Sequence, residues 1–146
     1  MDNLAHDFDP EEQKLQQEEV LDFLSWADFR LATQVLLSHI QEFEKQNSFK
    51  FESVYGLPRG GLPLAVTLSY KMKISLILEK ADITEKTLIV DDCTNTGKTL
   101  SQFMQGRKNY TAVLFQKPQS IFKPHFFFRE TENKINYCWE HEDERN

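Results

Sequence analysis

The segment TLIVDD, Thr87–Asp92, constrains the fold of this chain more than any other part of its sequence. Its apolar residues are continuous and do not alternate with polar ones, which indicates a strand buried on both faces. Such strands occur in parallel sheets that helices cover on both sides. The two aspartates that end the segment therefore fall at the carboxyl edge of the predicted sheet, where open α/β sheets bind their ligands.

Helical and strand periodicities alternate along the rest of the chain. In the helix predicted from Ser25 to Lys45, apolar residues recur at helical spacing, and Ser25 with Asp28 predicts a capping box. Further helices are predicted at 62–72 and near 97–105, and strands at 49–57, 74–80, 87–92 and 110–116, with late or edge strands at 125–128 and 135–139. This alternation predicts a single α/β domain with a mostly parallel central sheet flanked by helices.

Composition excludes several classes of protein. Apolar residues make up 40% of the 146 residues and charged residues 27%, as in ordinary globular domains, and no apolar run could span a membrane. The acidic start MDNLAHDFDPEEQ is not expected to be a secretory signal. Cys93 and Cys138 lack metal-type spacing, so they are predicted to be free thiols in a reducing cytoplasm.

The net charge of −6 is concentrated at the start of the chain. Residues 1–19 hold seven carboxylates and one lysine, whereas the remaining residues hold 16 acids and 16 bases. No basic surface dominates, so we expect no nucleic-acid partner. We predict an acidic tail or short helix over 1–19 and the folded domain over 20–146.

The turn that follows the two aspartates ends in Gly-Lys-Thr, which suggests a nucleotide-triphosphate loop. That motif needs a glycine five positions before Gly97, where Asp92 stands, and a carboxylate there would repel a triphosphate. A Walker-type hydrolase is therefore disfavoured. The backbone N–H groups at the helix start and the hydroxyls of Thr94, Thr96 and Thr99 instead predict a monophosphate site.

This stretch resembles the phosphoribosyl pyrophosphate (PRPP) signature of the type I phosphoribosyltransferases. In that family two acids at a strand end bind the ribose hydroxyls, and a Thr-Gly-x-Thr turn binds the 5-phosphate. The residues that match this signature are Asp91, Asp92, Thr96, Gly97, Lys98 and Thr99. The resemblance implies the family fold, PRPP as substrate, Mg²⁺ as cofactor and a homo-oligomer.

A second loop, PRGG, follows the strand predicted at 49–57. Two glycines and an arginine at a strand-to-helix turn suit an anion, although a plain turn has the same composition. In the family this is the pyrophosphate loop, and Pro58, Arg59, Gly60 and Gly61 match it. The resemblance implies that Arg59 stabilises the leaving pyrophosphate, and that the peptide between Pro58 and Arg59 is cis.

The third set of residues concerns the base and resembles the bacterial xanthine-guanine phosphoribosyltransferases. There, a lysine before a proline reads the purine oxygen, an apolar or aromatic residue stacks on the base, and an acid follows a tryptophan. Lys117, Ile135, Trp139 and Glu140 match in type and order. A solvent-exposed lysine and ordinary core residues remain the alternatives. The resemblance implies that Lys117, Ile135 and Trp139 contact the base. It also implies that Glu140 binds the metal together with Asp91 and Asp92.

Two departures from the family bear on catalysis. Purine members carry an aspartate near N7 of the base where this chain has Asn95, and an amide cannot act as a general base. The connection 81–86 is also too short for the family's mobile lid, so a neighbouring subunit or the N-terminal segment would have to exclude water. We predict an enzyme that transfers the phosphoribosyl group to a nucleobase, foremost a 6-oxopurine. A PRPP- or nucleotide-binding regulator without turnover is the alternative.

Overall fold

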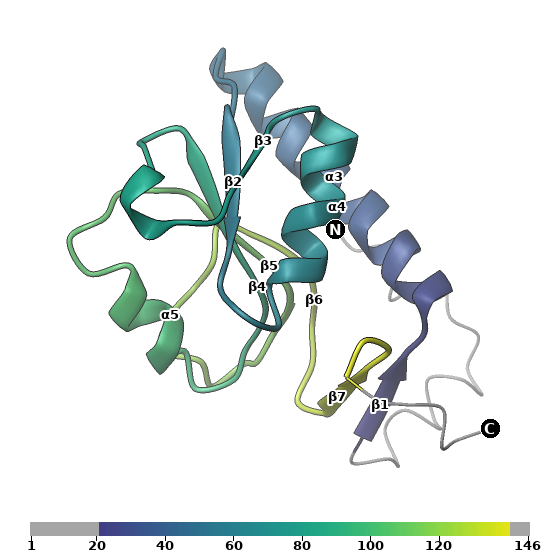
Figure 1. Cartoon of the computed structure of the whole chain (residues 1–146). Coiled ribbons are helices and arrows are strands. Elements are labelled where there is room, and N and C mark those ends of the chain that lie inside the picture. The colour runs from purple at the N-terminus through teal and green to yellow at the C-terminus, as the bar shows by residue number, and fades with distance from the viewer. Residues whose placement is uncertain (1–20, 141–146) are drawn as a thin grey trace.

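The computed structural model describes residues 21–140, which form a parallel five-stranded sheet with helices on both faces (Figure 1). The strand order is β3-β2-β4-β5-β6, and a separate parallel pair joins β1 to β7. The strands are β1 (Leu21–Leu24), β2 (Ser53–Gly56), β3 (Ser75–Ile77), β4 (Thr87–Thr94), β5 (Thr111–Gln116), β6 (Phe126–Glu130) and β7 (Lys134–Tyr137). The predicted α/β class with a parallel central sheet is confirmed. The acidic segment 1–19 lies outside the described residues.

Within residues 21–140, three α-helices connect and cover the strands: α3 (Trp26–Asn47), α4 (Leu62–Met72) and α5 (Lys98–Phe103). The predicted capping box of α3 is confirmed, because Ser25 Oγ accepts a hydrogen bond from the Asp28 N–H at 3.0 Å and Asp28 Oδ2 accepts one from the Ser25 N–H at 3.1 Å. Among the described helices, none is long and apolar enough to cross a membrane.

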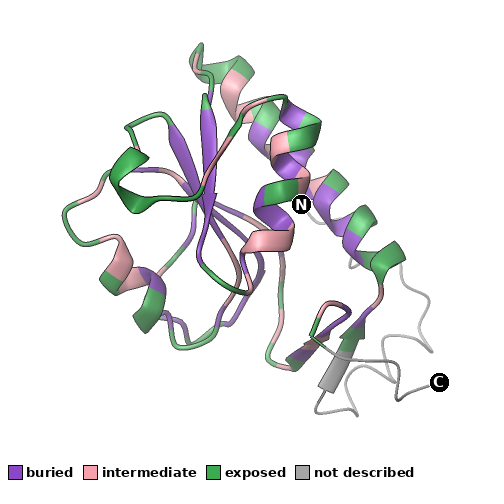
Figure 2. Cartoon of the chain, in the orientation of Figure 1, coloured by how far each residue is buried: buried purple, intermediate pink, exposed green. Residues whose placement is uncertain are grey.

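The centre of the sheet, formed by β2, β5 and the first four residues of β4, is buried on both faces, as the apolar run in β4 predicts (Figure 2). Leu88 and Val90 belong to the core that α3 and α4 cover, whereas Ile89 belongs to a smaller core with Leu100 of α5. Alternate residues of one strand thus enter two different cores, which is why the run from Leu88 to Val90 is entirely apolar.

Several elements differ from the sequence prediction. The strand predicted at 49–57 shortens to β2, because Phe49 and Phe51 pack instead against Phe43 and Tyr110 in an aromatic cluster. The strand predicted at 74–80 shortens to β3. The connection 81–86 begins with a 3-10 turn, η1 (Lys80–Asp82). The pairing of β1 with β7 was not predicted, because a strand of four residues carries little periodicity.

The two loops with family-like motifs meet where the topology reverses. β2 lies between β3 and β4, and the chain leaves β2 toward β3 but leaves β4 toward β5. The connections after β2 and β4 therefore diverge and open a crevice at the carboxyl ends of these two strands. Such a switch point is where open α/β sheets bind ligands.

Candidate active site

The loop after β2 is held against β4. The Leu57 N–H donates to the Val90 carbonyl at 2.9 Å, immediately before the two aspartates. A Cβ atom built on Gly60 would collide with the Asp92 carboxylate and lie 2.8 Å from its Cγ, so only glycine allows this approach. The Pro58–Arg59 peptide is cis, as the resemblance implied. The structure therefore brings the predicted pyrophosphate loop and the acidic pair together.

The turn after β4 encloses a small cavity of about 180 Å³. Gly97 has φ of 86°, and a Cβ there would lie 2.6 Å from the Phe122 nitrogen, so this position requires glycine. The Ile121 N–H donates to the Thr96 carbonyl at 2.9 Å and fixes the turn against the segment after β5. The cavity is lined by Asp91, Asp92, Cys93, Thr94, Asn95, Thr96, Gly97, Thr99 and Leu100.

The hydroxyls of this turn differ in their surroundings. Thr94 is buried, lines the cavity, and its Oγ1 has no hydrogen-bond partner among residues 21–140. Thr96 Oγ1 accepts from the Lys98 N–H at 3.2 Å, and Thr99 is exposed at the cavity. The Lys98 side chain is exposed and does not line the cavity. A cavity of this size, with free hydroxyl and amide donors, suits a single phosphate group.

A larger cavity of about 700 Å³ lies beside the first. It is lined by Arg59, Gly60, Asp92, Trp139 and Glu140. Asp92 lines both cavities, so a ligand that bridges them would pass this carboxylate. The dimensions and the polar groups suit a ligand with a phosphate at one end and a larger, partly anionic body at the other.

The two aspartates at the end of β4 are held close together. The Asp92 N–H donates to Asp91 Oδ1 at 2.9 Å. Burial, and then the charge of Asp92, raise the pKa of Asp91 to about 8, while burial raises the pKa of Asp92. Near neutral pH the ligand-free pair of aspartates therefore carries less than its full negative charge. A ligand that donates hydrogen bonds from hydroxyls, or that brings a cation, would favour the ionised form of both carboxyls.

The carboxylates also fit the predicted Mg²⁺, provided that the substrate supplies further ligands. Within residues 21–140, no group of three His, Cys, Asp or Glu side chains could hold a metal ion alone. Glu140 is nevertheless close enough to Asp92 for its charge to raise the pKa of that carboxyl. Mg²⁺ is usually bound by one or two carboxylates together with substrate phosphates and water, and this donor set can provide that share.

We predict that Asp91→Asn stabilises the ligand-free protein at alkaline pH. The folded pKa of Asp91 lies near 8 and the ordinary value is 3.8, so the native state binds the extra proton, and its free energy of unfolding falls as the pH rises between these values. Asparagine keeps the oxygen that accepts from the Asp92 N–H but cannot ionise. We expect a gain of about 1–3 kcal/mol at pH 8 and a smaller one at pH 5.

The measurement for this variant is urea unfolding at both pH values, without Mg²⁺ or ligand. Asp82→Asn is the control, because Asp82 is an exposed carboxylate in η1. If the free energy of unfolding of Asp91→Asn equals that of the parent protein at both pH values, the buried carboxylate does not destabilise the fold.

Two residues of the site were not predicted from the sequence. Cys93 Sγ donates to Asn95 Oδ1 at 3.5 Å, and Tyr137 Oη donates to the Asp92 carbonyl at 3.3 Å. Burial, then the nearby Asp92, raise the pKa of Cys93 to about 11, so this thiol stays protonated and can donate. The contact turns the Asn95 nitrogen, a hydrogen-bond donor, away from Cys93. The two-residue alternation that buries Ile135 also buries Tyr137, and this was the signal available in the sequence.

The residues predicted to contact the base are divided between the cavity and the core. Trp139 lines the larger cavity and stacks on Tyr137 with ring centroids 4.8 Å apart. Ile135 is buried in the main core and lines neither cavity. Lys117 is 5% exposed, and its Nζ donates to the carbonyls of Glu132 and Asn133. The structure therefore places Trp139 at the site, with Lys117 and Ile135 behind it.

Comparison with known proteins gives structural matches only. No protein-family model and no curated protein matches the chain. A purine phosphoribosyltransferase from Pyrococcus horikoshii Ot3 matches with a TM-score of 0.71 and 27% identity, over 85% of this chain and 96% of that chain. A Helicobacter pylori xanthine-guanine-hypoxanthine phosphoribosyltransferase matches with a TM-score of 0.71 and 20% identity, over 82% and 94%. A hypothetical protein from Neisseria gonorrhoeae, solved with bound ppGpp, matches with a TM-score of 0.70 and 16% identity. The match covers 84% of this chain and 90% of that chain.

The fold and the switch-point loops of the chain are similar to those of the type I phosphoribosyltransferases, as the sequence predicted. Within this class, the match with 27% identity is a purine enzyme.

Proposed function

We propose that the protein transfers the 5-phosphoribosyl group from PRPP to a nucleobase, foremost a 6-oxopurine, and releases pyrophosphate. The observation that carries this proposal is the convergence of three groups at one switch point. These are the carboxylates of Asp91 and Asp92, the enclosed turn with the free Thr94 hydroxyl, and the loop with Arg59. PRPP carries a diol, a monophosphate and a pyrophosphate, and each of them has a chemically matched partner here.

In this arrangement the small cavity binds the 5-phosphate through the backbone and hydroxyls of Thr94–Thr99. Asp91 and Asp92 accept hydrogen bonds from the ribose hydroxyls at the boundary between the cavities. The pyrophosphate extends along the larger cavity toward Arg59 and the amides of Gly60 and Gly61. Mg²⁺, held by the aspartates with Glu140, would supply positive charge against the pyrophosphate oxygens.

The reaction forms a bond between a nitrogen of the base and C1 of the ribose, while the bond from C1 to the pyrophosphate oxygen breaks and the base releases a proton to water. Positive charge develops on the ribose and negative charge on the leaving group. The aspartates would stabilise the positive charge on the ribose, and Arg59 would stabilise the negative charge on the leaving pyrophosphate. Groups that are already fixed when the charge develops contribute most, and contact with β4 fixes the Arg59 loop in this way.

For the base, Trp139 supplies a wall of the larger cavity and Asn95 supplies an amide donor for N7 of a purine. Lys117 is 5% exposed, lines neither cavity and donates to two backbone carbonyls, so it reaches the exocyclic oxygen of a 6-oxopurine only if the bound base displaces one of these contacts. The resemblance to the xanthine-guanine enzymes supports the same choice. We also propose a homo-oligomer in the cytoplasm, in which a second subunit covers the site, because the connection 81–86 contains only part of a 3-10 turn.

The experiment that tests this function is a panel of guanine, xanthine, hypoxanthine, adenine and uracil with PRPP and Mg²⁺. Pyrophosphate and the nucleoside monophosphate are measured together. We expect equal amounts of both products with at least one 6-oxopurine. Binding of PRPP without product from any base would favour the regulator, and turnover of uracil alone would contradict the purine assignment.

We predict that Arg59→Ala weakens PRPP binding about 10- to 100-fold, because a charge-assisted hydrogen bond contributes about 1.5–3 kcal/mol. Ribose 5-phosphate lacks the pyrophosphate, so its affinity should change by less than about twofold. Both affinities are measured by calorimetry with Mg²⁺, and Arg59→Lys serves as the conservative variant. Equal losses for the two ligands would show that Arg59 supports the loop instead of contacting pyrophosphate.

A further inference from the structure

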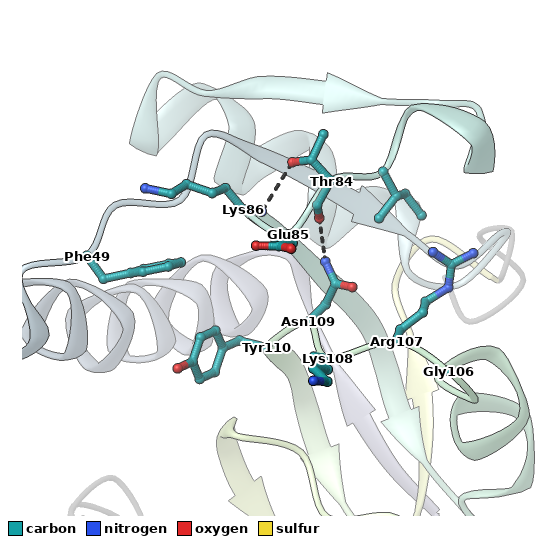
Figure 3. Close-up of a pocket in the computed structure, with 10 residues that line it drawn as sticks. Phe49, Thr84, Glu85, Lys86, Gly106, Arg107, Lys108, Asn109 and Tyr110 are labelled. Atoms are coloured by element: carbon teal, nitrogen blue, oxygen red, sulfur yellow. Dashed lines mark hydrogen bonds between the residues drawn. The ribbon is translucent and has the colours of Figure 1, made fainter.

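A second cavity lies at the edge of the sheet opposite the active site. It has a volume of about 750 Å³ and is formed by the segments that precede β4 and β5 (Figure 3). Because β4 and β5 are parallel, these segments meet at the amino edge, whereas the aspartates end β4 at the carboxyl edge. The cavity has the size of a small-molecule site, and the proposed reaction makes no use of it.

Asn109 fixes the floor of this cavity. Its Nδ2 donates to the carbonyls of Thr84 at 2.7 Å and Thr87 at 2.8 Å, so one side chain joins the two segments. Asn109 is buried, and its Oδ1 makes no hydrogen bond with the residues at 21–140. In Figure 3 this oxygen is turned away from Thr84. The floor therefore combines a rigid frame with a free acceptor.

The lining carries more positive than negative charge, although the whole chain is acidic. Three bases, Lys86, Arg107 and Lys108, line the cavity together with one acid, Glu85. Lys86 Nζ lies 5.0 Å from the centre of the Phe49 ring. The Arg107 guanidinium carbon lies 4.8 Å from the Phe103 ring, and its Nε donates to the Phe103 carbonyl at 3.2 Å.

These contacts place the cations without neutralising them. Within the described part of the chain, none of the three bases is paired with a carboxylate. Aromatic rings restrain Lys86 and Arg107 while leaving N–H groups free, so little side-chain entropy remains to be lost when an anion binds. Phosphate groups are the anions that such clusters of Lys and Arg bind best.

We propose that this cavity is a binding site for a phosphorylated small molecule of nucleotide size. Its phosphates contact Lys86, Arg107 and Lys108, and Asn109 Oδ1 accepts a hydrogen bond from the remainder of the ligand. The site is separate from the catalytic one, because β4 runs from its floor to the aspartate pair. It does not depend on the proposed phosphoribosyl transfer.

The test is a titration of the ¹⁵N-labelled full chain with ATP, without metal, followed through backbone amide shifts. We expect shifts at Gly106, Lys108 and Asn109 that saturate with a Kd on the order of 0.1–1 mM. Adenosine lacks phosphates and should leave these amides unmoved. Shifts confined to Thr96–Thr99, or equal binding of adenosine and ATP at the second cavity, would overturn the proposal.

A charge variant and a matched control complete the test. Lys86→Ala with Lys108→Ala removes two exposed cations and should weaken ATP binding at these amides about tenfold or more. Lys45→Ala with Lys71→Ala removes two exposed cations from α3 and α4 and should leave that affinity unchanged. Both variants should retain the parent's turnover of PRPP. Equal affinity in the two variants would reject the cavity as the site.

Discussion

PRPP with Mg²⁺ is expected to raise the melting temperature of the parent protein and to leave that of the Asp91→Ala, Asp92→Ala double variant unchanged. A ligand that binds only the native state stabilises it by mass action. At about 100 times its Kd the gain is about 2.7 kcal/mol, which corresponds to about 5–10 °C for a domain of this size. Asp92 lines both cavities and Asp91 lines the smaller one, so the double variant removes both carboxylates proposed to bind the ribose diol and the cation.

The double variant should fold well, which makes the result interpretable. Both carboxylates have raised pKa values because of burial, so their charged forms are unfavourable in the ligand-free fold. We therefore expect an unliganded melting temperature at pH 8 that equals or exceeds the parent's. Thermal unfolding with and without 1 mM PRPP measures both quantities. A ligand shift that survives in the double variant would remove the ribose site from the end of β4.

The second large effect is expected from Asn95→Asp. An amide cannot move a proton near N7, and proton transfer by a placed side chain typically contributes about 10²–10⁴-fold. If purine turnover is limited at this step, the variant should be about 10- to 100-fold faster at saturating PRPP. The geometry favours the substitution, because aspartate keeps the oxygen that accepts from Cys93 Sγ.

The same substitution should raise the KM for PRPP. A new carboxylate would stand beside two aspartates whose pKa values are already raised, and beside the bound phosphates. Initial rates with the base that the panel identifies, measured over a range of PRPP concentrations, separate kcat from KM. A parent enzyme that is already fast, and that Asn95→Asp slows, would mean that donation of a hydrogen bond from Asn95 to N7 suffices.

The sequence predicted those parts of the molecule whose signals are local. The buried strand β4, the capping box of α3 and the two loops at the switch point each carry a complete signal within a few residues. The turn at Gly97 also follows from local chemistry, since positive φ favours glycine. These features determined the fold class and the position of the site.

The features that the sequence did not predict depend on contacts between distant segments. The hydrogen bonds from Lys117 to the carbonyls at 132 and 133 join β5 to the turn before β7, and no periodicity encodes them. Tyr137 reaches Asp92 only because β7 lies near the end of β4. The aromatic packing that shortened the strand predicted at 49–57 likewise depends on Tyr110. Tertiary packing overrides local propensity at such positions.

The parallel pairing of β1 with β7 has a consequence for the order in which the protein becomes functional during its synthesis. Leu21 pairs with Lys134, so the first described strand has no partner until almost all the described chain has been translated. The five-stranded sheet and the two loops at the switch point can form earlier, since they lie between residues 53 and 130. Tyr137, the last residue of β7, and Trp139, which follows it, are positioned last. A nascent chain therefore forms the proposed phosphate site before Trp139, the proposed contact for the base, is in position.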